Sequence, residues 1–138
     1  MNIELKRVDD AFRLHATNER GDSLHSDGSA KIGAGEQGWR PMELLLVSLA
    51  GCSCIDIISV LKKQRQEIKD LKIDVSGTKK DGIPSPYETI NVHFTITGVV
   101  KETKMQKAIE LTKGKYCSVY FSLHPDIDVS YTYTLIPA

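Results

Sequence analysis

The longest apolar segment of the chain predicts one long helix. Between Arg40 and Lys63 the hydrophobic residues occur on every side of a helical projection rather than along one stripe. Pro41 suits the first helical turn, and the polar run from Lys62 to Gln66 is typical of a helix that emerges into water. We therefore expect a helix over about residues 41–66 that other structure surrounds on all sides.

Alternating apolar and polar residues on both sides of this helix predict β-strands. The expected strands lie in residues 2–17, which form a hairpin around Asp9 and Asp10, and in residues 23–26, 71–78, 88–97 and 127–136. We expect the pair 71–78 and 88–97 to form a second hairpin. In the last strand, Val129, Tyr131, Tyr133 and Leu135 are expected on one side.

Two shorter helices are predicted between the second hairpin and the last strand. Thr103 and Gln106 have the spacing of a capping box, and Gly114 stands where such a helix would stop. Residues 115–123 are expected to form a short third helix. The order β-β-β-α-β-β-α-α-β has no regular βαβ repeat, so it indicates an α+β fold with antiparallel sheets in a single domain over residues 1–138.

The small residues from Gly28 to Gly38 predict a mobile surface loop. The glycines in this segment match neither the Walker spacing nor the dinucleotide-binding spacing. We therefore expect no phosphate site there.

The apolar helix has two alternative environments. A membrane span is disfavoured because Ser48, Gly51, Ser53 and Ser59 interrupt it, and because an ionised Asp56 near its middle would cost several kcal/mol in lipid. The remaining residues cannot easily wrap the helix alone, so we expect a second copy of the chain to cover it in a homodimer.

Composition and charge exclude some classes of function and indicate the cellular compartment. The chain has 138 residues, with 18 lysines and arginines against 18 aspartates and glutamates, and no block of like charge. This balance predicts no nucleic-acid partner. The charged N-terminal residues do not resemble a secretory signal, so we expect a cytoplasmic protein, in which three cysteines indicate thiol chemistry or inert burial rather than a disulfide framework.

Three cysteines are candidates for thiol chemistry. Cys52 and Cys54 are two residues apart and so point about 200° away from each other on a helix. Gly51 is unusual inside a buried helix and favours Cys52 as the exposed thiol. Cys117 follows Gly114 and would begin a new helical turn, where free N–H groups stabilise a thiolate.

No metal site or cofactor is expected from the spacing of the candidate ligands. The four histidines, His15, His25, His93 and His124, lie on separate predicted strands and loops. No pair of histidines or cysteines has the C-x-x-C or H-x-x-x-H spacing of a metal site.

Two motifs give the chain a family resemblance. The run PMELLL from Pro41, followed by Gly51 and Cys52, resembles the Pro-Glu-Glu-Leu-Leu helix that leads to the first cysteine of the OsmC/Ohr family, the osmotically inducible and organic hydroperoxide resistance proteins. The run KYCS around Cys117 resembles the region of the family's second cysteine. The resemblance covers nearly the whole chain and points to a poorly characterised OsmC-like branch.

The resemblance implies a thiol peroxidase that works as an intertwined homodimer with sites between subunits. In that chemistry Cys52 attacks an organic hydroperoxide, and its sulfenic acid condenses with Cys117 to a disulfide. A small dithiol such as a lipoyl group then restores both thiols.

Two further site residues also follow from the resemblance. Family members orient the first thiol with a glutamate and an arginine, for which Glu43 and Arg20 are the candidates here, with Arg40 as an alternative to Arg20. The chain has Met42 where the family has its first glutamate. This departure leaves an alternative function, a catalytically degenerate protein that binds an apolar small molecule in the dimer pocket.

Overall fold

The computed structural model describes residues 1–138, and the chain divides into two compact units. The first unit is Met1–Leu45 and the second is Leu46–Ala138. The single domain expected over residues 1–138 stays a prediction.

The first unit contains a small antiparallel sheet. Its strands are β1 (Ile3–Arg7), β2 (Leu14–Asn18) and β3 (Ser23–Ser26), in the order β1-β2-β3, followed by a 3-10 turn over Ala30–Ile32. The N-terminal hairpin and the short third strand are both where the alternation predicted them. At the β2–β3 turn, the Asn18 side chain accepts hydrogen bonds from the N–H groups of Arg20 and Asp22, which fixes the reversal.

A buried aspartate organises the segment that was expected to be a mobile loop. Asp27 is only 2% exposed, and its carboxylate accepts hydrogen bonds from the Gly28 N–H at 2.8 Å and the Gln37 N–H at 2.9 Å. These two bonds join the beginning and the end of the glycine-rich segment. The hydrogen bond from Gln37 is the main reason that the pKa of Asp27 is lowered, and the Gly28 bond and the charge of Arg40 act in the same direction.

Asp27→Asn is expected to lower the melting temperature near neutral pH, because an amide NH₂ group cannot accept the hydrogen bond that one carboxylate oxygen accepts. The folded-state pKa of Asp27 lies below its unfolded value, so its stabilisation is complete above about pH 4 and is lost as pH falls through the folded pKa. The difference in melting temperature between the wild type and Asp27→Asn should therefore shrink below about pH 4. Thermal unfolding measured from pH 3 to pH 7 checks this, and an equal difference at all pH values would contradict it.

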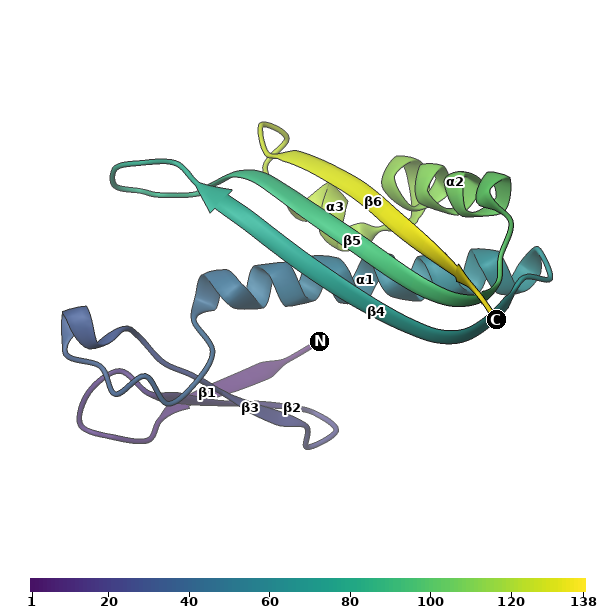
Figure 1. Cartoon of the computed structure of the whole chain (residues 1–138). Helices are drawn as coiled ribbons and strands as arrows, with labels where there is room; N and C mark the ends of the chain where they lie inside the picture. The colour runs from purple at the N-terminus through teal and green to yellow at the C-terminus, as the bar shows by residue number, and fades with distance from the viewer. The chain divides into compact units, whose positions relative to one another are not determined.

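The second unit packs helices on a three-stranded sheet. Helix α1 (Pro41–Lys63) leads into it, followed by β4 (Glu67–Lys79), β5 (Tyr87–Val99), α2 (Glu102–Leu111), a π-helical turn (Thr112–Tyr116), α3 (Ser118–Ser122) and β6 (Asp128–Pro137). This confirms the predicted order of elements and the α+β class. Both hairpin strands extend beyond the predicted alternation, and in Figure 1 the helices of this unit lie behind the curved sheet.

The pairing of the last strand corrects the expectation of purely antiparallel sheets. The sheet order is β4-β5-β6, with β4 antiparallel to β5 and β6 parallel to β5. The α2–α3 segment carries the chain back to the end where β5 begins, so β6 enters in the same direction, as crossover connections require. Val129 of β6 is buried on the expected side, and Tyr131, Tyr133 and Leu135 are less exposed than the residues between them.

The core of the second unit lies between β5 and the helices. Alternate residues of β5 are fully or almost fully buried, namely Ile90, Val92, Phe94 and Ile96. They share the core with Leu49, Ile57 and Leu61 of α1 and with Met105 of α2. Each of these side chains contributes roughly 1.5–3 kcal/mol by its removal from water.

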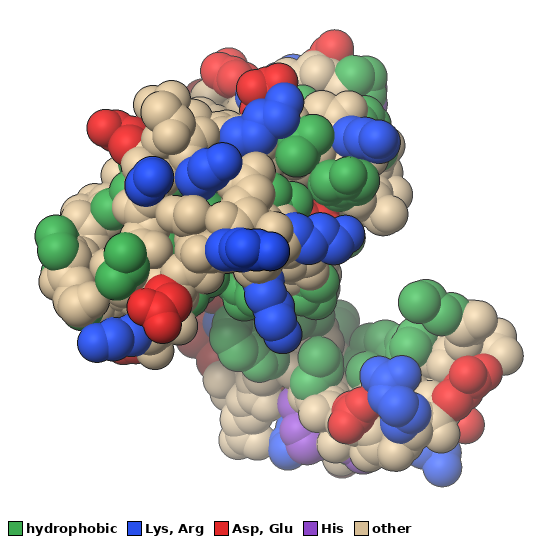
Figure 2. Space-filling view, turned by 90° about the vertical axis from the view of Figure 1, so that its right-hand side faces the viewer, with side chains coloured by type: hydrophobic (Ala, Val, Ile, Leu, Met, Phe, Trp, Pro, Cys, Tyr) green, Lys and Arg blue, Asp and Glu red, His purple; other side chains and the backbone are tan.

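Helix α1 is less buried within one chain than its sequence predicted. One side is covered, but Val47, Ile55 and Ile58 are 46%, 68% and 41% exposed. The helix ends at Lys63 rather than at Gln66, and Arg65 just beyond it has a positive φ of 58°. By length and composition alone, α1 could cross a membrane. Figure 2 shows hydrophobic side chains exposed among charged ones of both signs.

The region before Cys117 also differs from the sequence prediction. Helix α2 begins at Glu102, directly after Lys101, so the predicted capping box of Thr103 and Gln106 is wrong. Gly114 does not stop the helix but lies inside the π-helical turn, which closes with a 2.9 Å hydrogen bond from the Cys117 N–H to the Thr112 carbonyl oxygen. Such wide turns often occur at functional sites.

Candidate functional site

Three side chains from two separate elements of the second unit converge on one point. The sulfurs of Cys52 and Cys117 and a carboxylate oxygen of Asp56 all lie within 4.8 Å of one another. All three cysteines are free thiols. The structure thus brings together the two cysteines that the resemblance selected and adds a carboxylate.

We call Cys52, Asp56 and Cys117 the dithiol cluster, which is carried by helix α1 and the N-terminus of α3. Cys52 and Asp56 are four residues apart, so their side chains share one face of α1. Cys117 is the N-cap residue of α3 and has extended backbone dihedral angles. Cys54 points elsewhere and is partly buried, and this burial raises its pKa. The choice of Cys52 over Cys54 agrees with this geometry.

Cys117 is completely buried and held by hydrogen bonds. Its sulfur accepts a hydrogen bond from the Tyr120 N–H at 3.4 Å and lies 3.5 Å from the Ser53 hydroxyl oxygen. The Ser53 hydroxyl oxygen in turn lies 3.0 Å from the hydroxyl oxygen of Tyr131. Burial raises the pKa of Tyr131 to about 12. The expected N–H contact at the start of a helix is therefore present.

Burial nevertheless dominates the acidity of Cys117. Removal from water raises the pKa of Cys117, and the hydrogen bonds from Ser53 and the Tyr120 N–H offset this only in part. The neighbouring Cys52 thiol also raises it. The sequence-based expectation that the helix start would make Cys117 acidic is therefore wrong, because desolvation outweighs the helix terminus.

Asp56 is the member of the cluster that sequence reasoning missed. It was treated only as an interruption of an apolar segment, although its spacing of four residues from Cys52 on a helix was a usable signal. Its Oδ2 atom is shielded from solvent and has no hydrogen-bond partner. Burial accordingly raises the pKa of Asp56.

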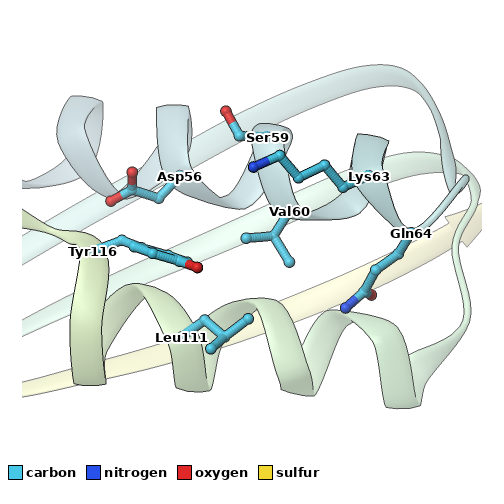
Figure 3. A pocket seen from close by; sticks show the side chains of 7 residues that line it. All are labelled: Asp56, Ser59, Val60, Lys63, Gln64, Leu111 and Tyr116. Atoms are coloured by element: carbon cyan, nitrogen blue, oxygen red, sulfur yellow. The ribbon is translucent and has the colours of Figure 1, made fainter.

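A cleft of about 300 Å³ begins at Asp56 and runs along α1. It is lined by Asp56, Ser59, Val60, Lys63, Gln64, Leu111 and Tyr116. Figure 3 shows the α1 side chains on one side of the cleft and Leu111 and Tyr116 on the other. Neither cysteine lines the cleft, so Asp56 is the residue that links it to the dithiol cluster.

The predicted orienting glutamate has a structural role in its own unit. A carboxylate oxygen of Glu43 accepts a hydrogen bond from the Arg40 N–H at 2.8 Å, the pattern by which a glutamate in the first turn caps its helix. The Arg40 guanidinium pairs with Glu36 at 3.3 Å and donates to the Gly38 carbonyl oxygen.

Arg20, the other candidate cation, and two lysines close to Cys117 in sequence also have partners. Arg20 is exposed in the β2–β3 turn and pairs with Asp22 at 3.3 Å. Lys113 donates a hydrogen bond to the Val129 carbonyl oxygen, and Lys115 lies over the ring of Tyr116. The roles of Glu43, Arg20 and Arg40 in orienting or ionising Cys52 stay predictions.

Fold and site together define an α+β protein with two neighbouring free cysteines. One lies on a long helix and the other at the start of a short helix. Comparison with known proteins identifies its family. Residues 33–132 match the family described as OsmC-like protein. Protein YhfA of Escherichia coli strain K12 is 31% identical over 119 residues, which cover 86% of each chain. The chain belongs to the OsmC-like family.

Solved structures agree with this assignment. A hypothetical protein from Aquifex aeolicus is 32% identical, with a TM-score of 0.86 over 99% of this chain and 96% of that one. An organic hydroperoxide resistance protein from Legionella pneumophila is 15% identical, with a TM-score of 0.72 over 97% of both chains. At that identity the second likeness concerns the fold alone.

Proposed function

We propose that the protein is a thiol-dependent peroxidase that reduces organic hydroperoxides through a Cys52–Cys117 disulfide. The observation that carries the proposal is the approach of the two sulfurs to within 4.8 Å, although the cysteines are distant in the sequence. A disulfide needs a sulfur separation of about 2.0 Å, so the two side chains must rotate toward each other to close the remaining gap. A protein of the same fold from Legionella pneumophila is called an organic hydroperoxide resistance protein, and this name motivates the proposed substrate class.

The two cysteines have different exposure and therefore different roles. Cys52 is partly exposed, whereas Cys117 is completely buried. A peroxide arriving from solvent meets Cys52 first, so Cys52 is the peroxidatic cysteine and Cys117 the resolving one. Ser53 and the Tyr120 N–H hold the Cys117 sulfur in place for the second step.

The proposed cycle has three balanced steps. The Cys52 thiolate attacks the distal peroxide oxygen and, with one proton, gives Cys52 sulfenic acid and an alcohol. The Cys117 thiol then attacks the sulfenic sulfur, which forms the disulfide and releases water. A small dithiol such as a lipoyl group reduces the disulfide by exchange and becomes a cyclic disulfide itself.

The proposal includes a homodimer in a reducing compartment such as the cytoplasm. The exposed Val47, Ile55 and Ile58 side chains on α1 would remain in water in a single chain. A second copy that covers them removes this apolar surface from water. A reducing compartment keeps the dithiol available between turnovers.

Two observations favour the alternative, a catalytically degenerate protein that binds an apolar small molecule. Glu43, the candidate for orienting the thiol, caps its own helix, and Met42 replaces the acid that precedes it in the family. The cleft beside Asp56 offers a volume of about 300 Å³ for such a ligand. In that case the cysteines would stay reduced in the presence of hydroperoxide.

Mass spectrometry after oxidation tests the proposal. We expect one equivalent of cumene hydroperoxide to convert the reduced wild type to a species 2 Da lighter per chain, with a linkage mapped between Cys52 and Cys117. Native spectra of the same sample should show twice the chain mass of 15.3 kDa. Cys54→Ser is the matched control and should form the same linkage. Unmodified thiols, or a linkage through Cys54, would contradict the proposal.

A further inference from the structure

The dithiol cluster contains more than disulfide chemistry requires. A disulfide needs two sulfurs, but the cluster also holds a carboxylate oxygen within 4.8 Å of both. The Oδ2 atom of this carboxylate is shielded from solvent and has no hydrogen-bond partner in the protein. A shielded acceptor without a partner is destabilising, and an external group that binds this oxygen would remove the cost.

We propose that Cys52, Asp56 and Cys117 form a binding site for a thiophilic divalent cation, with Zn²⁺ as the best match. Two thiolates and one carboxylate are ligands that zinc accepts together, whereas magnesium and calcium require oxygen ligands. The carboxylate also argues against copper(I), which prefers soft sulfur ligands, and against iron–sulfur clusters, which take four cysteines or cysteines with histidines.

The separations of the three side chains suit a tetrahedral site. With Zn–S distances of about 2.3 Å and tetrahedral angles, two coordinating sulfurs lie about 3.8 Å apart. The observed limit of 4.8 Å is within about 1 Å of this value, a shift that side-chain rotation supplies. The ligands come from one face of α1 and from the N-cap of α3, so two separate elements of the backbone already hold them around one point.

Groups around the ligands support the site. Ser53 and the Tyr120 N–H contact the Cys117 sulfur, and Tyr131 holds Ser53 in turn. Outer contacts of this kind orient metal ligands and balance the charge of a thiolate. Three protein ligands leave a fourth position for water, the arrangement of zinc sites that are open to a further ligand.

Metal binding and disulfide formation exclude each other at this cluster. A bound Zn²⁺ ion withdraws electron density from both thiolates, so hydroperoxide oxidises them more slowly than the free thiolates. Oxidation of the two thiolates by R′OOH with two protons gives the disulfide, R′OH and water, and it releases Zn²⁺ unchanged. Zinc should therefore protect the reduced cluster, and oxidation should release the metal.

Titration of the reduced, metal-free full-length protein with Co²⁺ tests the site. We expect one Co²⁺ per chain, with thiolate-to-metal charge-transfer absorption and the intense visible bands of tetrahedral cobalt, both removed by one equivalent of Zn²⁺. Cys52→Ser and Cys117→Ser should abolish the charge-transfer signal of the two-thiolate site. Asp56→Asn should weaken Co²⁺ binding at least about 10-fold.

Cys54→Ser is the matched control, since it removes a thiol from the same helix outside the cluster, and its titration should equal that of the wild type. Absence of a stoichiometric cobalt signal overturns the inference, as does binding that Asp56→Asn leaves unchanged or that Cys54→Ser abolishes. A second measurement needs no variant: Zn²⁺ should slow the alkylation of Cys52 more than that of Cys54 in the wild type. This result does not depend on peroxidase activity, so the two proposals can fail separately.

Discussion

Cys52→Ser is expected to lower the turnover of cumene hydroperoxide with a dithiol reductant at least about 100-fold, because a serine hydroxyl cannot replace a thiolate as the nucleophile. Cys52 is the partly exposed member of the sulfur pair, so no other thiol of the cluster is open to the substrate. Peroxide consumption measured in the presence of a metal chelator checks the prediction without interference from bound zinc.

The remaining cysteines distinguish the steps of the cycle. Cys117→Ser should still consume about one equivalent of hydroperoxide per chain and stop as a sulfenic acid, which a sulfenate-trapping reagent labels. Cys54→Ser should turn over at the wild-type rate. Turnover that survives in Cys52→Ser would remove the peroxidase proposal, whereas turnover that is absent from the wild type with every dithiol would favour the binding function.

Phe94→Ala is expected to reduce the free energy of unfolding by about 3–5 kcal/mol, the range for truncation of a fully buried aromatic side chain. Phe94 is completely buried on β5, and its ring stacks on Tyr131 with centroids 6.3 Å apart. Tyr131 contacts Ser53, which contacts the resolving Cys117. The cavity that Phe94→Ala leaves therefore lies next to the side chains that hold Cys117.

Denaturant unfolding at a fixed protein concentration measures this change. Phe94→Leu keeps a buried hydrophobic side chain and should lose clearly less stability than Phe94→Ala. A loss below about 1 kcal/mol for Phe94→Ala would show that the core relaxes around the missing ring and that Phe94 does not support the site.

Local patterns predicted most of the fold. Alternation located all the strands, and the apolar segment after Pro41 located α1, because these signals depend on residues that are close in sequence. The prediction failed where a competing local structure formed. Lys101 rather than Thr103 precedes α2, and a π-helical turn carries the chain past Gly114.

The candidate site was predicted in part. Cys52 and Cys117 were selected from a family resemblance, and the fold brings their sulfurs together. The spacing of Asp56 from Cys52 places both side chains on one face of α1, but the approach of Cys117 to that face depends on residues distant in sequence, so Asp56 was missed. The acidity of Cys117 was misjudged because burial, which dominates its pKa, depends on packing that no local pattern reports.

The sequence by itself determined which segments form strands and helices, since propensity, alternation and turn residues act over a few neighbouring positions. Only the tertiary structure decided that β6 runs parallel to β5, that Asp56 meets the two sulfurs, and that Cys117 is removed from water. Each of these depends on contacts between residues distant in the chain, whose partners are set by the packing of the whole unit around Phe94 and its neighbours.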